Sequence, residues 1–176
     1  MRRYKSAILL FSILALLLVT GCWSGKQKAE FEQLAIDCVE SHEDVLLELF
    51  DILKNNYIYQ IKEFDRKDDE DIGFVIKYND REIYIILDSS ADATLYDEGY
   101  RQACEIFDFL LSRYPVSKIN CLVNKDMYVY FEERYLLVDW GIAYYPLEAS
   151  TPESDEYDVY LNIKDGFYIY YYYPGF

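Results

Sequence analysis

Basic residues, histidine and paired cysteine motifs are all scarce in this chain. Its 17 Lys and Arg residues face 32 Asp and Glu residues, which gives a formal net charge of −15, and it has one histidine. A protein this acidic repels the phosphate backbone of nucleic acid, which we therefore exclude as a partner. The lack of any Cys-x-x-Cys pair removes the usual support for a zinc or thiol redox site.

The sequence signatures of the common enzyme classes are also missing. The chain has no G-x-S-x-G, no S-x-x-K, no glycine-rich phosphate loop and no dinucleotide or kinase fingerprint. We therefore expect a protein that is not an enzyme and that uses no metal and no cofactor. An enzyme or a small-ligand-binding protein with an unidentified pocket is the alternative.

Two groupings of residues could in principle carry chemistry. His42 lies one helical turn from Cys38, an arrangement in which a base can activate a thiol, but both fall on an apolar helix face. That position favours a packed histidine over a catalytic pair. The acidic run at 65–71 offers oxygen ligands for calcium, yet it misplaces the glycine and the terminal glutamate of an EF-hand loop. We expect a solvated loop there.

The N-terminal residues have the pattern of an export signal. Arg2, Arg3 and Lys5 precede an apolar run at 7–19, which at roughly 1.5 Å per residue is too short for a hydrocarbon core about 30 Å thick. The run ends in Leu-Val-Thr-Gly-Cys at 18–22. This segment resembles the lipobox of bacterial lipoproteins, in which small residues precede the cleavage site and a cysteine follows it.

The resemblance implies how the chain is processed and anchored. It gives a signal peptide at 1–21, cleavage between Gly21 and Cys22, and a diacylglycerol on the sulfur of Cys22. The rest of the chain then consists of a short lipidated tether at 22–28 and, from its length, a single domain at 29–176. Two or three acyl chains anchor a protein firmly. We therefore expect a lipid-anchored protein on the extracytoplasmic side of the cell membrane or envelope. An ordinary secretory signal, or an uncleaved anchor, is the alternative.

Removal of the signal makes the protein more acidic and leaves three further cysteines. The mature chain has 14 basic and 32 acidic residues, a net charge of −18. Such a charge attracts cationic proteins and peptides, although solubility alone also explains it. Cys38, Cys104 and Cys121 each fall on an apolar face, so we expect buried, unpaired thiols, with a single disulfide as the alternative.

Two amphipathic helices are predicted from apolar residues at helical spacing. The first has its apolar positions between Phe31 and Leu53 and ends near Asn55. The second begins at Thr94, whose hydroxyl can cap the backbone, and ends before Pro115.

Strands account for most of the remaining chain. Short links between them predict antiparallel pairing, and the order α-βββ-α-ββββ(β) predicts an α+β fold with two helices packed on a mainly antiparallel sheet. Hairpin turns are predicted at 79–81 and at Asp165-Gly166, and a long loop at 144–156. The predicted strands are 57–64, 73–78, 82–87, 118–123, 126–131, 135–140, 157–163 and 167–173.

Tyrosine is the residue in excess, with 20 in the chain and five of them between 168 and 173. Alternation along this last strand places Tyr168, Tyr170 and Tyr172 on one side and the odd-numbered residues on the other. One side can enter the core, whereas the other must be covered or exposed. Exposed tyrosines offer rigid, amphipathic area for stacking on sugars or holding a protein.

These features together predict a non-catalytic binding module. Its acidic, tyrosine-rich surface, with Tyr168, Tyr170 and Tyr172 as candidate contacts, would meet a basic envelope protein or peptide, or a glycan, while the lipid on Cys22 holds it to the membrane. A structural or assembly role is a third reading. A closed pocket with converging polar groups would favour the enzyme or ligand binder, and a flat aromatic surface the interaction protein.

Overall fold

The computed structural model describes residues 2–64, 73–88, 98–122, 126–132, 138–146 and 158–172, and gives the backbone alone for 2–24 and 158. The chain divides into two compact units, 1–34 and 35–176. The first unit is helical from residue 2 onward, with Lys26–Glu30 and Lys28–Glu32 ion pairs at helical spacing. No helix in the described part of the chain combines the length and apolar character needed to cross a bilayer.

Helix α1 (Arg2–Asn55) starts earlier than the predicted helix and ends where predicted. Its first half includes Gly21 and Cys22, so the residues expected as signal and tether have helical backbone. At its end, the backbone and side-chain amides of Asn56 both donate to the Ile52 carbonyl, at 3.1 and 2.7 Å. The next residue, Tyr57, has a positive φ of 55°, which stops the helix.

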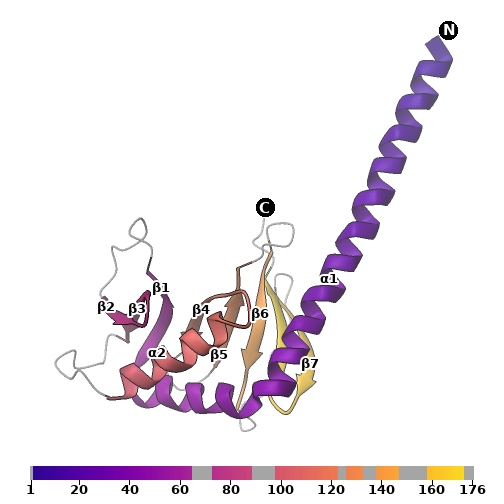
Figure 1. Cartoon of the computed structure of the whole chain (residues 1–176). Coiled ribbons are helices and arrows are strands. Elements are labelled where there is room, and N and C mark those ends of the chain that lie inside the picture. Colours follow the sequence, from indigo (N-terminus) through magenta and orange to yellow (C-terminus); the bar gives the residue numbers. More distant parts are fainter. Residues whose placement is uncertain are drawn as a thin grey trace. The chain divides into compact units, whose positions relative to one another are not determined.

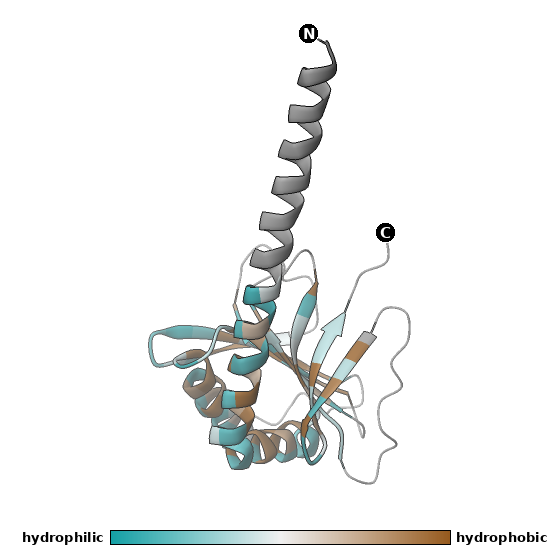
Figure 2. Cartoon of the chain, turned by 90° about the vertical axis from the view of Figure 1, so that its right-hand side faces the viewer, coloured by the Kyte–Doolittle hydropathy of each residue, from teal (hydrophilic) through white to brown (hydrophobic). Residues whose placement is uncertain are grey.

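Helix α2 (Glu98–Leu111) packs beside the last part of α1. Figure 1 shows the two segments side by side on the same side of the sheet, and Figure 2 shows that both alternate between hydrophilic and hydrophobic residues. A Cβ on Gly99 would collide with the side chain of Asn56, so the start of α2 touches the end of α1. The helices therefore run antiparallel. The predicted cap at Thr94 lies outside the described residues.

The strands form one eight-stranded sheet in the order β2-β3-β1-β4-β5-β6-β8-β7. Every pair is antiparallel. The predicted α+β class, with two helices on a mainly antiparallel sheet, is confirmed. The strands are β1 (Ile58–Glu63), β2 (Gly73–Tyr78), β3 (Arg81–Leu87), β4 (Val116–Cys121), β5 (Met127–Phe131), β6 (Asp139–Tyr144), β7 (Asp158–Lys164) and β8 (Phe167–Tyr172).

The predicted strand at 135–140 ends four residues too early, since the structure has β6 at Asp139–Tyr144, and residues 135–137 lie outside the described residues. Gly141, which the prediction left outside the strand, lies inside β6. A Cβ there would collide with the carbonyl of Val129 on β5, so the close approach of two backbones requires glycine. Tyr144 therefore ends a strand and does not start a loop, and the rest of the predicted loop, 147–156, lies outside the described residues.

The core lies between the helices and one face of the sheet. Alternate residues of each central strand point toward the helices, where Phe50 of α1 packs on Tyr144 and Tyr100 of α2 on Phe74. The largest fully buried side chains are Trp140, Tyr171, Phe107, Phe167, Leu46, Leu49, Leu53, Ile58, Ile61, Ile83, Ile85 and Leu110.

Candidate functional site

The sheet face opposite the helices carries a continuous group of tyrosines, which we call the tyrosine surface. Register explains how they meet: β5, β6, β8 and β7 are neighbours, and each contributes outward residues at the same level. Both α2 and the part of α1 from Ala35 onward lie on the other face (Figure 1). The tyrosine surface consists of Tyr128, Tyr130, Tyr145, Tyr160, Tyr168 and Tyr170.

Tyr170 lies at the centre of the tyrosine surface. Its ring centroid is 5.2 Å from that of Tyr128, 5.5 Å from Tyr160 and 6.2 Å from Tyr130. Tyr145 closes the other end, 5.9 Å from Tyr168. Most of these contacts are edge-to-face, the geometry that aromatic pairs prefer. The rings thus hold one another in place.

Three hydroxyl groups of the tyrosine surface converge. The hydroxyls of Tyr128 and Tyr145 lie 2.6 Å apart, and Tyr160 also interacts with both. Burial raises the pKa of Tyr128 and of Tyr145, and hydrogen bonding from Tyr128 and Tyr160 raises that of Tyr145 further. Burial also raises the pKa of Tyr130 to about 12. These phenols stay protonated at neutral pH, so they donate and accept hydrogen bonds but do not serve as bases.

The border of the tyrosine surface is polar and carries charges of both signs. On β4, the ammonium group of Lys118 lies 4.4 Å from the ring centroid of Tyr130. Beside it, the side-chain amide of Gln60 donates a hydrogen bond to the side-chain oxygen (Oδ1) of Asn120 at 2.8 Å. Asp139 on β6 raises the pKa of Tyr130 through its charge, so a carboxylate also lies nearby. The surface is therefore amphipathic and close to neutral.

The sequence placed two members of the tyrosine surface correctly on one face and missed four. Tyr168 is half-buried and Tyr170 is 8% exposed, both inside the group. Tyr172 is 37% exposed and makes no ring contact with the described residues. The missed residues are on other strands. Tyr128 and Tyr130 alternate in β5 as outward residues do, but only the strand order shows that they meet Tyr170.

The helix layer, on the other side of the sheet, is strongly acidic. From Ala35 to its end, α1 has six carboxylates and one lysine, Lys54, while α2 has three carboxylates and one arginine, Arg101. These nine carboxylates are thus on the face opposite the tyrosine surface, whereas the sequence joined acidic and tyrosine-rich features in one surface. The carboxylates are Asp37, Glu40, Glu43, Asp44, Glu48 and Asp51 of α1, and Glu98, Glu105 and Asp108 of α2.

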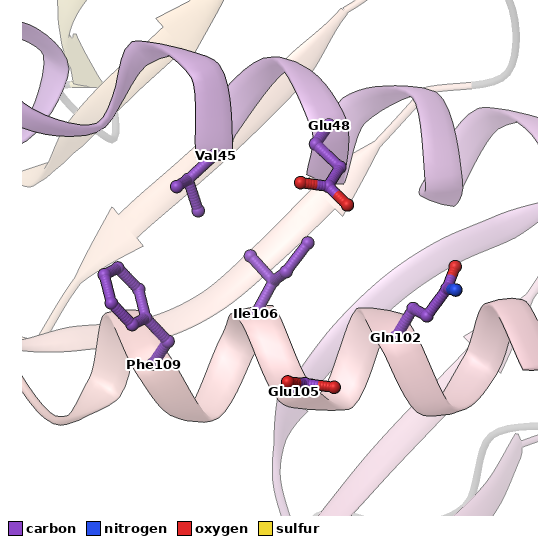
Figure 3. A pocket seen from close by; sticks show the side chains of 6 residues that line it. All are labelled: Val45, Glu48, Gln102, Glu105, Ile106 and Phe109. Carbon is purple, nitrogen blue, oxygen red and sulfur yellow. The ribbon is translucent and has the colours of Figure 1, made fainter.

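A groove of about 320 Å³ runs between the two helices (Figure 3). Val45 and Glu48 of α1 point across it toward α2. The opposite wall is formed by residues of α2 at successive helical turns. These are Gln102, Glu105, Ile106 and Phe109.

His42 lies at the Phe109 end of α2 and packs as expected. The backbone of His42 leaves helical geometry (φ −141°, ψ 32°), so α1 kinks there. Its ring meets Phe109 and Tyr114 edge-on, with centroids 5.1 and 5.8 Å apart. Burial raises the pKa of the Cys38 thiol to about 12, opposite to what an activated nucleophile needs.

The cysteine prediction is confirmed, because Cys38, Cys104 and Cys121 are buried and unpaired. Burial raises the pKa of Cys104 to about 12 and that of Cys121 to about 11. Among the described residues, no three His, Cys, Asp or Glu side chains come together as metal ligands would. The acidic run at 65–71 lies outside the described residues, and the structure describes Gly21 and Cys22 by their backbone alone.

Comparison with known proteins adds no relative. The chain matches no family model, no curated protein and no solved structure. Its function must therefore be inferred from its own residues.

Proposed function

We propose that the protein is a lipid-anchored, extracytoplasmic binding module that holds another envelope protein through the tyrosine surface and performs no catalysis. The observation that carries the proposal is the set of six tyrosines in mutual ring contact on a sheet face. An aromatic surface on a sheet face is typical of an interaction protein, whereas a small-ligand site is concave.

Three properties of the tyrosine surface suit it to protein binding. Tyrosines give large contact area at low entropic cost, since each has few rotatable bonds. Their rings are already packed on one another, so little further ordering is needed on binding. The amides of Gln60 and Asn120 and the charges of Lys118 and Asp139 form the polar border that surrounds the apolar centre of most interfaces.

The acidic helix layer has a different part in this proposal. It lies on the opposite face, so its carboxylates do not contact what the tyrosine surface holds. Their field still extends about 10 Å into solvent at 0.1 M salt. It would speed the approach of a basic partner without fixing its residence time.

The anchoring half of the proposal is tested by Cys22→Ser in growing cells. We expect loss of labelling by a fatty-acid analogue, because Cys22 would carry the lipid, while the buried Cys38, Cys104 and Cys121 stay in place as internal controls. A Cys22→Ser chain that is still cleaved and acylated would contradict the lipobox assignment.

The binding half is tested by crosslinking followed by kinetics. A photo-crosslinking residue at Tyr172, on the border of the tyrosine surface, should capture a protein in intact cells, and the same residue at Glu40 of α1 should not. With the captured protein purified, Tyr160→Ser combined with Tyr168→Ser should raise its dissociation rate about tenfold or more, the usual effect of removing interface hot spots.

The control variant is Tyr57→Ser, which removes a tyrosine that is 49% exposed and outside the tyrosine surface. Its dissociation rate should equal that of the unchanged protein. An unchanged rate in the Tyr160 and Tyr168 variant, with the protein still folded, would reject the tyrosine surface as the contact. Capture of a glycan and not a protein would contradict the proposal that the partner is a protein.

A further inference from the structure

We propose that the groove between α1 and α2 is a second interaction site, one that accepts a basic amphipathic helix of another protein. This site does not depend on the tyrosine surface, because it lies in the helix layer on the opposite face of the sheet. The apolar floor of the groove, its acidic rim and its volume together indicate which kind of molecule it can bind.

The floor of the groove is apolar. Val45 of α1 and Ile106 and Phe109 of α2 are half-buried and point into the space between the helices (Figure 3). The α2 residues that line it, from Gln102 to Phe109, cover two turns, roughly 10 Å at 1.5 Å per residue. A third helix lying along two antiparallel helices places side chains every three to four residues into such a groove.

The rim of the groove is acidic. Glu48 and Glu105 are exposed on its two sides, and neither forms an ion pair with the described residues, although the charge of Glu105 does interact with that of Arg101, which pairs with Glu98. Other carboxylates of the helix layer do have one: Asp108 pairs with Arg81, and Glu43 with Lys164. The rim therefore offers two carboxylates above an apolar floor, which suits Lys and Arg, whose stems are apolar and whose ends are charged.

The same charge argues against the other occupants. A second copy of this chain would bring another acidic helix layer to the groove, and an anionic lipid surface would likewise be repelled. The volume of about 320 Å³ is at the lower end of small-molecule sites. It is enough for a few side chains of a helix that lies mostly outside the groove.

The test uses the full-length lipoprotein in a non-ionic detergent and a labelled synthetic peptide of about 15 residues, long enough to form a helix on binding. The peptide carries leucines at helical spacing and lysines on both flanks. A control peptide has glutamate in place of every lysine. Fluorescence anisotropy should show saturable binding of the lysine peptide, weakening as salt rises, and no binding of the glutamate peptide.

Paired variants locate the site. Glu48→Gln combined with Glu105→Gln should weaken binding about fivefold, from two exposed charge pairs. The matched control, Glu40→Gln combined with Glu82→Gln, removes two exposed carboxylates that do not line the groove and should change the affinity less than twofold. Ile106→Asp, which puts a charge on the floor, should weaken binding at least tenfold.

Thermal melts check that each variant is folded. If Ile106→Asp does not fold, the comparison of the Glu48 and Glu105 double variant with the Glu40 and Glu82 double variant still tests the proposal. Four outcomes overturn the proposal. They are no binding of the lysine peptide, equal binding of the glutamate peptide, equal weakening by both glutamine pairs, and loss of peptide binding in the Tyr160→Ser and Tyr168→Ser variant. The last result would show that the peptide binds to the tyrosine surface and not to the groove.

Discussion

The two faces of the sheet differ in what covers their aromatic and apolar side chains. The face toward the helices is covered by α1 and α2, and Trp140 and Phe167 on it have no exposed surface. On the opposite face, the tyrosines shield one another. Hydroxyl groups make this possible, since they give each ring a polar end. The first face therefore stabilises the fold, and the second is the face that we propose for binding.

The largest expected effect in this comparison is on the covered face. Trp140 packs on Phe131 with ring centroids 4.6 Å apart and is fully buried. Trp140→Ala should lower the free energy of unfolding by about 3–5 kcal/mol, because it leaves a large cavity. Urea denaturation measures it, and Tyr168→Ala on the tyrosine surface is the matched control. A loss as large in Tyr168→Ala would contradict the division of roles between the faces.

The next effect concerns Gly141, the neighbour of Trp140 in β6. Gly141→Ala should cost about 1–3 kcal/mol, because the added Cβ meets the backbone carbonyl of Val129, which can move only with β5. The same substitution at Gly25, around which there is open space, is the control and should not destabilise the protein. If both alanine variants are equally stable, the backbones of β5 and β6 do not lie as close together at Gly141 as the structure shows.

A smaller effect is expected within the tyrosine surface. Tyr128→Phe removes the hydroxyl that lies 2.6 Å from that of Tyr145 and should lower the free energy of unfolding by about 1 kcal/mol, the usual contribution of one hydrogen bond. Tyr128→Phe with Tyr145→Phe should cost less than the sum of the two single losses, because the hydrogen bond that the two hydroxyls share is lost only once. Additive losses would show that the two hydroxyls do not interact.

The raised phenol pKa values have the smallest effect on the free energy of unfolding at neutral pH. Their effect appears only at alkaline pH. The pKa of Tyr130 is raised from an unfolded value of about 10 to about 12. Between these values the unfolded chain releases a proton that the folded chain keeps, so the stability present below pH 10 falls as pH rises toward 12. Urea denaturation from pH 8 to pH 11 should show this fall, and Tyr130→Phe should make it shallower. An identical fall in both proteins would rule out Tyr130 as a contributor.

Much of the architecture follows from local sequence patterns. Alternation predicted most strands and both sides of β8, and helical spacing predicted the apolar faces that bury Cys38 and Cys104, because these patterns depend on the geometry of one element at a time. The misplaced end of β6 shows where that reasoning stops. The need for glycine at 141 comes from the backbone of Val129, which belongs to another strand, so the pattern within β6 does not reveal it.

The sequence by itself determined the class of fold, the burial of the cysteines, the excess of acid and tyrosine, and the pattern that resembles a lipobox. Only the tertiary structure decided that Tyr128, Tyr130, Tyr145 and Tyr160 join Tyr168 and Tyr170, that the carboxylates of the two helices lie on the opposite face, and that a groove separates α1 from α2. The reason is physical. Which way a side chain points is set by its own strand or helix, whereas which side chains meet is set by the order in which strands pair, and that order minimises the free energy of the whole chain.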